Sequence, residues 1–156
     1  MTHILTINNS EIIKKMEART FKFGKAREEA AGDKLTNNVK MTDMPYERDM
    51  LYDWIDNAVA NIRSSFDKYA QNVQVSYASG HNGDKEYKIS TIPFILSEKW
   101  DSANGDGFDS DCKESIINSV ISDFLELSLP KESELYALKA MQALKNAERK
   151  LYFKKA

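Results

Sequence analysis

The chain has 156 residues, of which 42% are hydrophobic and 29% charged, and these proportions suit a globular protein rather than a disordered one. The net charge of −2 argues against a protein that binds nucleic acid over its whole surface. No apolar run approaches the roughly 18 residues of a membrane span, and the first residues lack the features of a secretory signal. We therefore expect one soluble intracellular domain over residues 1–156, without a membrane partner.

One cysteine and two histidines limit the chemistry that the chain can carry. Cys112 alone cannot form an internal disulfide framework or a zinc site with several thiolates. His3 lies at the terminus and His81 in a predicted turn, so neither has an obvious nucleophilic partner. The sequence also lacks a nucleophile-elbow serine motif and a glycine-rich phosphate loop. We expect no enzyme activity, no metal and no cofactor.

Basic and acidic residues are unevenly distributed along the chain. Residues 1–40 carry eight Lys or Arg and five Asp or Glu, and residues 112–156 carry eight and six. Residues 41–111, in contrast, carry six basic and thirteen acidic residues. The basic ends therefore complement the acidic middle, either within one fold, which is the simpler interpretation, or between neighbouring copies of the chain.

A short extended segment leads into the first predicted helix. Asn8 and Glu11 stand at capping-box spacing, with two further cap candidates directly after Asn8. Apolar residues give this helix a stripe for packing: Ile12, Ile13, Met16 and Phe23. The helix ends at Gly24 or continues to Gly32, and the polar residues 33–41 are expected to be irregular.

The most regular pattern lies between residues 42 and 69. Thr42 or Asp43 is predicted to cap a helix, and Pro45 suits its first turn, where the missing N–H costs nothing. Apolar residues then recur at steps of three and four: Leu51, Trp54, Ile55, Ala58, Ile62, Phe66 and Tyr69. This predicts a helix of nearly 30 residues, about 40 Å long, with one end that projects or packs on another molecule.

Alternating residues predict a β-hairpin after this helix. Residues 73–77 and 87–91 alternate between apolar and polar side chains, on either side of a turn at residues 80–84. We expect a three-residue loop in which Gly83 adopts the left-handed conformation.

The register of this hairpin follows from matching its faces. The preferred register places Val75 opposite Ile89, whereas a two-residue turn would place Val75 opposite Ser90 and mismatch the faces. The return strand continues through residues 92–96. Pro93 cannot donate a hydrogen bond to a sheet, so this part is expected to be an edge strand or an extended arm.

The polar segment 97–111 has the composition of a calcium loop. When Gly107 is aligned with the sixth position of an EF-hand, Lys113 occupies the twelfth, where a bidentate glutamate is required. We therefore expect a solvated loop, with an irregular calcium site as the alternative. Asp111 and Glu114 are predicted to cap the helix that follows.

Two further helices are predicted to close the chain as an αα unit. The first carries a dense apolar set: Ile116, Ile117, Val120, Ile121, Phe124 and Leu125. Pro130 marks the start of the second, which runs to about Phe153. On it we expect large residues to face inward, at Leu135, Leu138, Met141, Leu144 and Leu151. Small residues are expected to allow close approach of a neighbouring helix, at Ala137, Ala140, Ala143 and Ala147.

Basic residues alternate with aromatic ones in two stretches, residues 14–25 and residues 149–155. Such stretches suit contact with a phosphate backbone, where lysines neutralise charge and aromatic rings stack on bases. They equally suit the C-terminal ends of helices, where the helix dipole favours cations. A small nucleic-acid-binding or regulatory protein that uses these basic N- and C-terminal segments is therefore the alternative function.

Three segments follow one another in an order that resembles a known group of proteins. They are the helix exit Arg19–Lys25, the amphipathic segment Met50–Val59 and the closing unit Leu129–Phe153, with a strand pair between the last two. This layout resembles small structural proteins from the tail and neck gene clusters of phages and prophages of gut anaerobes, including crAss-like phages. The resemblance transfers no catalytic or binding residue.

The resemblance implies a virion protein that is made in the host cytoplasm and assembles in many copies. It implies a head-to-tail connector, ring, collar or tail-completion role, with the portal and neighbouring ring or tail proteins as partners and with DNA nearby. The residues themselves predict an α+β fold, mainly α, with about four helices, one β-hairpin and a C-terminal αα unit. Contact residues are expected at the hairpin tip, the Pro93 arm and the C-terminal tail: His81, Asn82, Pro93, Phe94, Arg149, Lys150, Tyr152, Phe153, Lys154 and Lys155.

Overall fold

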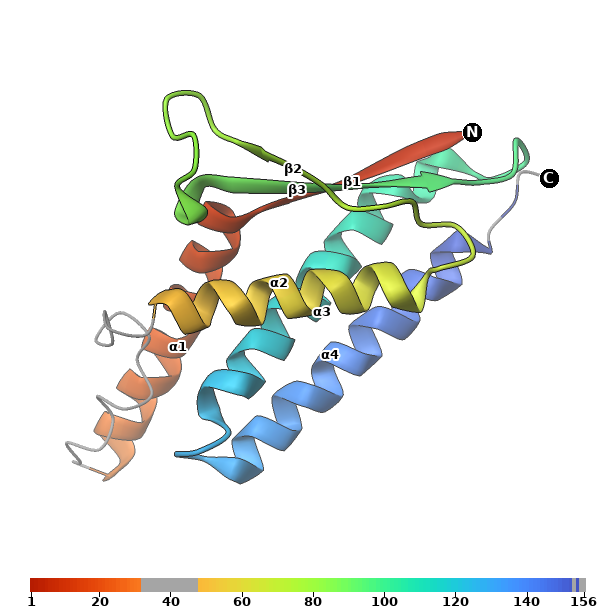
Figure 1. The fold of residues 1–156 in the computed structure, drawn as a ribbon. Coiled ribbons are helices and arrows are strands. Elements are labelled where there is room, and N and C mark those ends of the chain that lie inside the picture. The colour runs from red at the N-terminus through yellow and green to blue at the C-terminus, as the bar shows by residue number, and fades with distance from the viewer. Residues whose placement is uncertain (32–47, 153, 155–156) are drawn as a thin grey trace.

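Four helices and a three-stranded antiparallel sheet form the described part of the chain, residues 1–31, 48–152 and 154 of a computed structural model (Figure 1). In chain order they are β1 (Thr2–Asn8), α1 (Asn9–Ala31), α2 (Arg48–Ser65), β2 (Gln74–Tyr77), β3 (Lys88–Ile95), α3 (Gly105–Leu125) and α4 (Pro130–Leu151). Two short 3-10 helices, η4 (Lys85–Tyr87) and η5 (Ser102–Asn104), lie in the connections. The predicted α+β class, mainly α, is confirmed. Among these residues, no helix combines the length and apolar character that a membrane span requires.

The N-terminal strand β1 forms one edge of the sheet, although only a short extended start was predicted there. The strand order is β1-β3-β2, and β1 pairs with β3 along its whole length, from Thr2 opposite Ile95 to Asn8 opposite Ile89. β3 is therefore the central strand. The expectation that Pro93 lies in an edge strand or a free arm is wrong.

Pro93 is tolerated in this central strand because its nitrogen points toward residues 69–71, which precede β2 and do not form a continuous strand beside β3. The carbonyl of Pro93 accepts a hydrogen bond from the Gln71 backbone N–H (2.8 Å), and the Ile95 N–H donates to the Tyr69 carbonyl (2.9 Å). These alternate groups of β3 face residues 69–71, ahead of β2. The missing donor therefore affects only the exposed Gln71, where water can replace the bond.

The pairing of β2 with β3 differs by one residue from the predicted register. Val75 lies opposite Ser90, the arrangement that face matching disfavours. Ala70 forms a bridge with Phe94, and the first pair of β2 is Gln74 with Thr91. Three residues, 71–73, therefore lie opposite two residues of β3, 92–93, and the extra residue acts as a bulge. Because Val75 is 51% exposed, burial does not fix the register of this strand.

The connection between β2 and β3 is longer than the predicted three-residue loop. Gly83 is left-handed as predicted, with φ of 82°, and Gly80 has a φ of 80°. The carboxylate of Asp84 accepts a hydrogen bond from the Glu86 backbone N–H (3.1 Å) and caps η4. This 3-10 turn includes Tyr87, which was predicted to begin the return strand.

α1 follows the longer of the two predicted alternatives, because it continues through Gly24 to Ala31. Asn8 Oδ1 accepts a hydrogen bond from the Ser10 backbone N–H (3.1 Å), so Asn8 satisfies one of the free donors at the start of the helix. The predicted capping box is not completed, since the Glu11 carboxylate contacts lysines instead of the backbone of Asn8.

α2 has 18 residues and ends at Ser65, so the prediction of a helix of nearly 30 residues that includes Tyr69 is wrong. After α2 the chain turns toward the sheet. The Ala70 backbone N–H donates to the Phe66 carbonyl (2.8 Å), and Ala70 forms a bridge with β3. This end therefore does not project. The predicted cap at residues 42–45 lies outside the described residues.

α3 begins at Gly105 rather than at Asp111, so part of the predicted loop is helical. Two glycines near its start, Gly105 and Gly107, have low helix propensity and hide the helix in the sequence. Asp111 is not a cap, because its carboxylate accepts a hydrogen bond from Lys150 Nζ on α4. Among the described residues, no group of three or more His, Cys, Asp or Glu is placed to hold a metal ion.

The core lies between one face of the sheet and the helices beneath it (Figure 1). Phe66, Phe94 and Phe108 meet there with ring centroids 5.1 to 6.0 Å apart. The apolar set predicted for α3 is buried as expected: Ile116, Ile117, Val120, Ile121, Phe124 and Leu125. α3 and α4 run side by side as an antiparallel pair, which confirms the predicted C-terminal αα unit.

Candidate interaction surface

α4 packs on α3 through small side chains. Ala140, Ala143 and Ala147 are buried, with Ala147 fully so. Ser115 Oγ on α3 donates a hydrogen bond to the Ala140 carbonyl of α4 (3.0 Å). A side-chain hydroxyl reaches a backbone carbonyl across two helices only when the helices approach closely, and small residues permit this. The alanines are therefore the packing face of α4.

Polar contacts near both ends of α4 hold this orientation. Ser122 Oγ donates to the Ser133 carbonyl and Ser133 Oγ donates to the Ser122 carbonyl, both at 2.8 Å. At the other end, Trp100 Nε1 donates to the Lys150 carbonyl (2.9 Å). Each bond joins α4 to α3 or to the segment before it, so the rotation of α4 about its own axis is fixed.

This orientation turns large apolar residues of α4 outward. Leu135 is 50% exposed, Leu138 63% and Met141 57%, so the prediction that these three face inward is wrong. Leu151 is buried as predicted, and Leu144 is half-buried. The sequence pattern has two apolar faces on α4, and close packing on α3 selects the face with the smaller side chains.

We define the outer face of α4 by seven exposed residues that share one side of the helix and its end: Lys131, Glu134, Leu138, Met141, Lys145, Glu148 and Tyr152. Its four charged residues form no ion pair with any other described residue. Nine large hydrophobic side chains are exposed in the described part of the chain; three of them lie on α4 (Leu135, Leu138 and Met141) and two just outside its ends (Leu127 and Tyr152). Exposed apolar side chains gathered on one element are typical of interaction surfaces.

The hairpin tip and the Pro93 segment, both predicted as contact surfaces, differ in accessibility. His81 and Asn82 are exposed, and the His81 ring stacks on Tyr87 with centroids 3.8 Å apart. Phe94 is fully buried in the core, so it is not available to a partner and its prediction as a contact residue is wrong. Pro93 is half-buried in the central strand.

The predicted C-terminal surface is only partly available. Lys150 binds Asp111, as described above, whereas Arg149 and Lys154 are exposed and Tyr152 is 59% exposed. Phe153 and Lys155 lie outside the described residues. Arg149 and Tyr152 are therefore exposed to solvent, whereas Lys150 bonds to Asp111 of α3.

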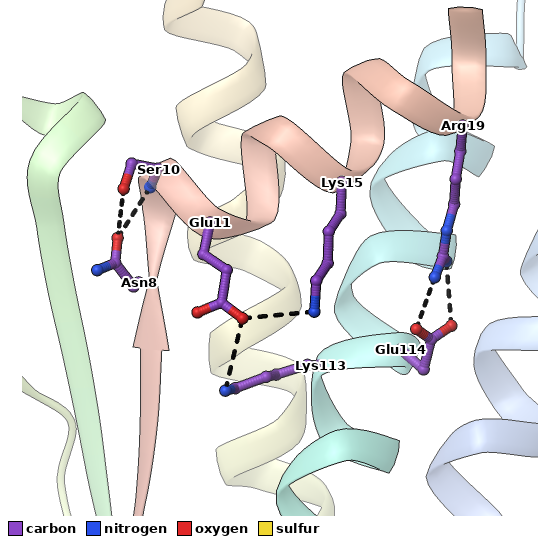
Figure 2. Close-up of polar contacts among 7 residues, drawn as sticks. All are labelled: Asn8, Ser10, Glu11, Lys15, Arg19, Lys113 and Glu114. Carbon is purple, nitrogen blue, oxygen red and sulfur yellow. Dashed lines mark hydrogen bonds and ion pairs between the residues drawn. The ribbon is translucent and has the colours of Figure 1, made fainter. Parts of the chain in front are cut away.

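Two basic residues of the predicted N-terminal stretch, Lys15 and Arg19, lie beside carboxylates within the fold (Figure 2). Arg19 makes two hydrogen bonds to the Glu114 carboxylate, at 3.0 and 2.6 Å. Glu11 lies 3.4 Å from Lys15 Nζ and 3.9 Å from Lys113 Nζ. The contacts to Lys113 and Glu114 hold α1 on α3, and Lys15 and Arg19 are thereby less available to a phosphate backbone, whereas Lys14 is exposed.

Cys112 is a buried thiol in this fold. It is fully buried, and burial together with the nearby charges of Asp109 and Asp111 raises the pKa of the thiol well above its ordinary range. His3 Nε2 lies 2.7 Å from Asp109 Oδ1, so this imidazole has a carboxylate as its partner. A thiolate is the nucleophilic form of cysteine, so this environment opposes nucleophilic chemistry.

A cavity of about 410 Å³ lies beside the end of α4. Its walls include the rings of Tyr69 and Tyr152, and two lysines, Lys68 and Lys154, stand at it. Lys68 Nζ lies 5.4 Å from the Tyr69 ring centroid. Proteins bind single-stranded nucleic acid with such elements: aromatic rings stack on the bases and nearby cations contact the phosphates.

No protein-family model, curated protein or solved structure matches this chain. Its candidate functions therefore depend on the surfaces described above and on the layout of its segments. Of these surfaces, the outer face of α4 is the one that exposes large apolar side chains which the packing of the monomer does not use.

Proposed function

We propose that this chain is a non-enzymatic structural protein that assembles with copies of itself, as a connector, ring or collar component at the head-to-tail junction of a phage. The observation that carries the proposal is the outer face of α4. Leu138 and Met141 lie on a helix whose packing face is made of alanine, so their burial is not needed for the fold. Covering them on another molecule removes apolar surface from water.

The phage setting comes from the layout of the segments, which resembles neck and tail proteins, and not from any single residue. In that setting the partners are further copies of this chain, the portal, and neighbouring ring or tail proteins. The protein is made in the host cytoplasm and resides in the virion, close to the DNA path.

The mass of the purified protein in solution, followed by light scattering over a concentration series, tests this proposal. We expect the wild-type mass to rise with concentration to a defined multiple of the monomer. Leu138→Asp places a charge in the middle of the apolar patch and is expected to lower that mass. A wild-type protein that stays monomeric over the whole series contradicts self-assembly.

Met50→Asp is the matched control for this experiment. Met50 is 49% exposed in the first turn of α2, where a carboxylate also suits the helix dipole. It is expected to assemble like the wild type. An equal loss of mass in both variants would show that any added charge disrupts assembly, and would contradict a specific role of α4.

Nucleic-acid binding is the second candidate, and the cavity beside Tyr69 and Tyr152 is the observation that favours it. Lys68 and Lys154 form no ion pair with another described residue and could contact phosphates. Retention on single-stranded DNA should then fall steeply as salt rises from about 50 mM. No retention at that salt concentration would contradict this function and leave assembly as the single proposal.

A further inference from the structure

We infer that the outer face of α4 binds the same face of a second copy, with the two helices antiparallel and a two-fold axis between Leu138 and Met141. The inference rests on the proposed self-assembly and adds its geometry: which residues meet, in which direction. A two-fold contact pairs two copies and cannot close a ring alone, so a ring needs a second contact elsewhere on the chain.

The spacing of the outer face is that of a two-helix seam. Lys131, Leu138, Lys145 and Tyr152 recur every seven residues, and Glu134, Met141 and Glu148 follow the first three of them by three positions. Side chains at a seven-residue repeat with steps of three and four stay on one side of a helix and can pack along a partner helix. All seven are exposed here. This repeat is visible in the sequence and could have marked the face before the structure did.

The charges on this face determine the direction of the partner. In an antiparallel pair centred between Leu138 and Met141, each copy places Leu138 against Met141 of the other. The same geometry places Glu134 against Lys145, and Lys131 against Glu148, of the other copy. Every charged contact is then between opposite charges, and each occurs twice because of the two-fold symmetry.

A parallel pair of the same helices would reverse this result. Each residue would then lie next to its own equivalent, so that Lys131, Glu134, Lys145 and Glu148 would all face like charges. Four like-charge layers disfavour the parallel arrangement, and two apolar residues at the centre cannot compensate for them. The charge pattern is therefore self-complementary in one direction only.

The ends of the seam carry apolar side chains that suit the same arrangement. Leu127 is 97% exposed in the corner between α3 and α4, and Tyr152 is 59% exposed at the opposite end of α4. α4 has 22 residues, so it is about 33 Å long. Antiparallel pairing brings Leu127 of one copy to the end where Tyr152 of the other copy lies. Both exposed side chains thereby gain apolar partners.

Two single charge reversals test this geometry in the full chain. Glu134→Lys alone gives a pair in which lysine faces Lys145 twice, and Lys145→Glu alone gives a pair in which glutamate faces Glu134 twice. Each variant is expected to weaken dimer formation by about tenfold, measured as the dimer dissociation constant by analytical ultracentrifugation. Both residues are exposed, so circular dichroism should show unchanged folding.

Mixing the two variants is the decisive step. In a mixed pair, the lysine introduced by Glu134→Lys in one copy faces the glutamate introduced by Lys145→Glu in the other. The native Lys145 of the first copy likewise faces the native Glu134 of the second. We expect the equimolar mixture, and also the double variant E134K/K145E, to recover the wild-type dissociation constant. Failure of the mixture to associate better than either variant alone would overturn the antiparallel pairing.

Lys139→Glu is the matched control, because Lys139 is exposed on α4 but lies outside the seam, over the Tyr136 ring at 4.7 Å. It should leave the dissociation constant unchanged. If the wild type assembles but neither Glu134→Lys nor Lys145→Glu affects its mass, the inferred pairing is wrong and the proposed self-assembly stands on another surface. If the wild type is monomeric at every concentration, both are wrong.

Discussion

Leu138 and Ala140 lie two residues apart on α4 and face opposite sides of it. Leu138 is 63% exposed, whereas Ala140 is 7% exposed and its carbonyl accepts a hydrogen bond from Ser115 Oγ (3.0 Å). The smaller side chain therefore packs in the protein and the larger one faces out. This inversion separates the residues that stabilise the monomer from those available for assembly.

This arrangement predicts that enlarging a residue on the packing face of α4 lowers the free energy of unfolding, whereas shortening a residue on its outer face hardly changes it. Ala147→Leu adds volume at a fully buried position against α3 and is expected to cost about 1–3 kcal/mol in the free energy of unfolding. Leu138→Ala removes an exposed side chain from the monomer and should change that free energy by less than about 0.5 kcal/mol. Urea unfolding at a concentration where the protein is monomeric measures both. A larger loss for Leu138→Ala would contradict the orientation of α4.

The helices could be predicted from the sequence because their apolar residues recur with helical spacing, but the packing face of α4 could not. Periodicity identifies apolar positions and does not say whether leucine or alanine will meet the neighbouring helix. The serines decide this, since Ser122 and Ser133 bond to each other's backbone and fix how close α3 and α4 lie. Such contacts between helices are not visible in the pattern of one helix.

Long-range pairs show the same limit. Arg19 was predicted as part of a basic surface, yet it binds Glu114, which is 95 residues away in the chain (Figure 2). Similarly, β1 pairs with β3 although its seven residues gave no strand signal strong enough to place it in the sheet. The sequence indicates which residues are available for such contacts, and the fold determines which of them meet.

Gly105 begins α3, whose first turn was not predicted, and it packs closely against the His3 ring. A Cβ at this position would lie 2.9 Å from His3 Cε1, and the His3 ring is held by Asp109 (2.7 Å) and by contact with Trp100. Gly105→Ala should therefore destabilise the protein by about 1–3 kcal/mol, although alanine normally favours a helix. In the His3→Ala background the cost should disappear, and a double-mutant cycle of unfolding free energies measures this coupling.

Gly107→Ala is the control for this cycle. Its Cβ would lie 2.9 Å from Lys150 Cε, a methylene of a long side chain that can change rotamer more readily than the His3 ring, although its Nζ is bonded to Asp111. We expect a change between zero and about 1 kcal/mol of stabilisation. Equal destabilisation at both glycines would indicate that α3 does not begin where the structure places it.

Asp123 gives the stability a pH dependence of predictable sign. Burial, and then the charge of Glu126, raises the pKa of the Asp123 carboxyl. Below the ordinary Asp pKa of about 3.9, the folded and unfolded states both hold the proton and the carboxyl costs nothing. As the pH rises toward the elevated folded pKa, the unfolded state ionises first and stability falls. Above that value the full cost remains.

Asp123→Asn keeps the shape of the side chain and removes its charge. The variant should be more stable than the wild type at pH 7, by less than about 1 kcal/mol because solvent screens this partly exposed carboxyl. The difference should vanish near pH 3. Thermal or urea unfolding over this pH range measures it, and a variant that is less stable at pH 7 would show that the charge is favourable.

Cys112 provides a test of how well the buried side of α3 is shielded from solvent. Its thiol is fully buried, and burial with the charges of Asp109 and Asp111 raises its pKa, so the native protein opposes formation of the thiolate that reacts with alkylating reagents. Iodoacetamide should therefore modify the native protein at least about 100-fold more slowly than the protein in concentrated guanidinium. The chain has one cysteine, so the unfolded protein should take up a single equivalent, which mass spectrometry counts. Rapid modification of the native protein would instead mean that the thiol is accessible and ionised, and would contradict the buried position of Cys112.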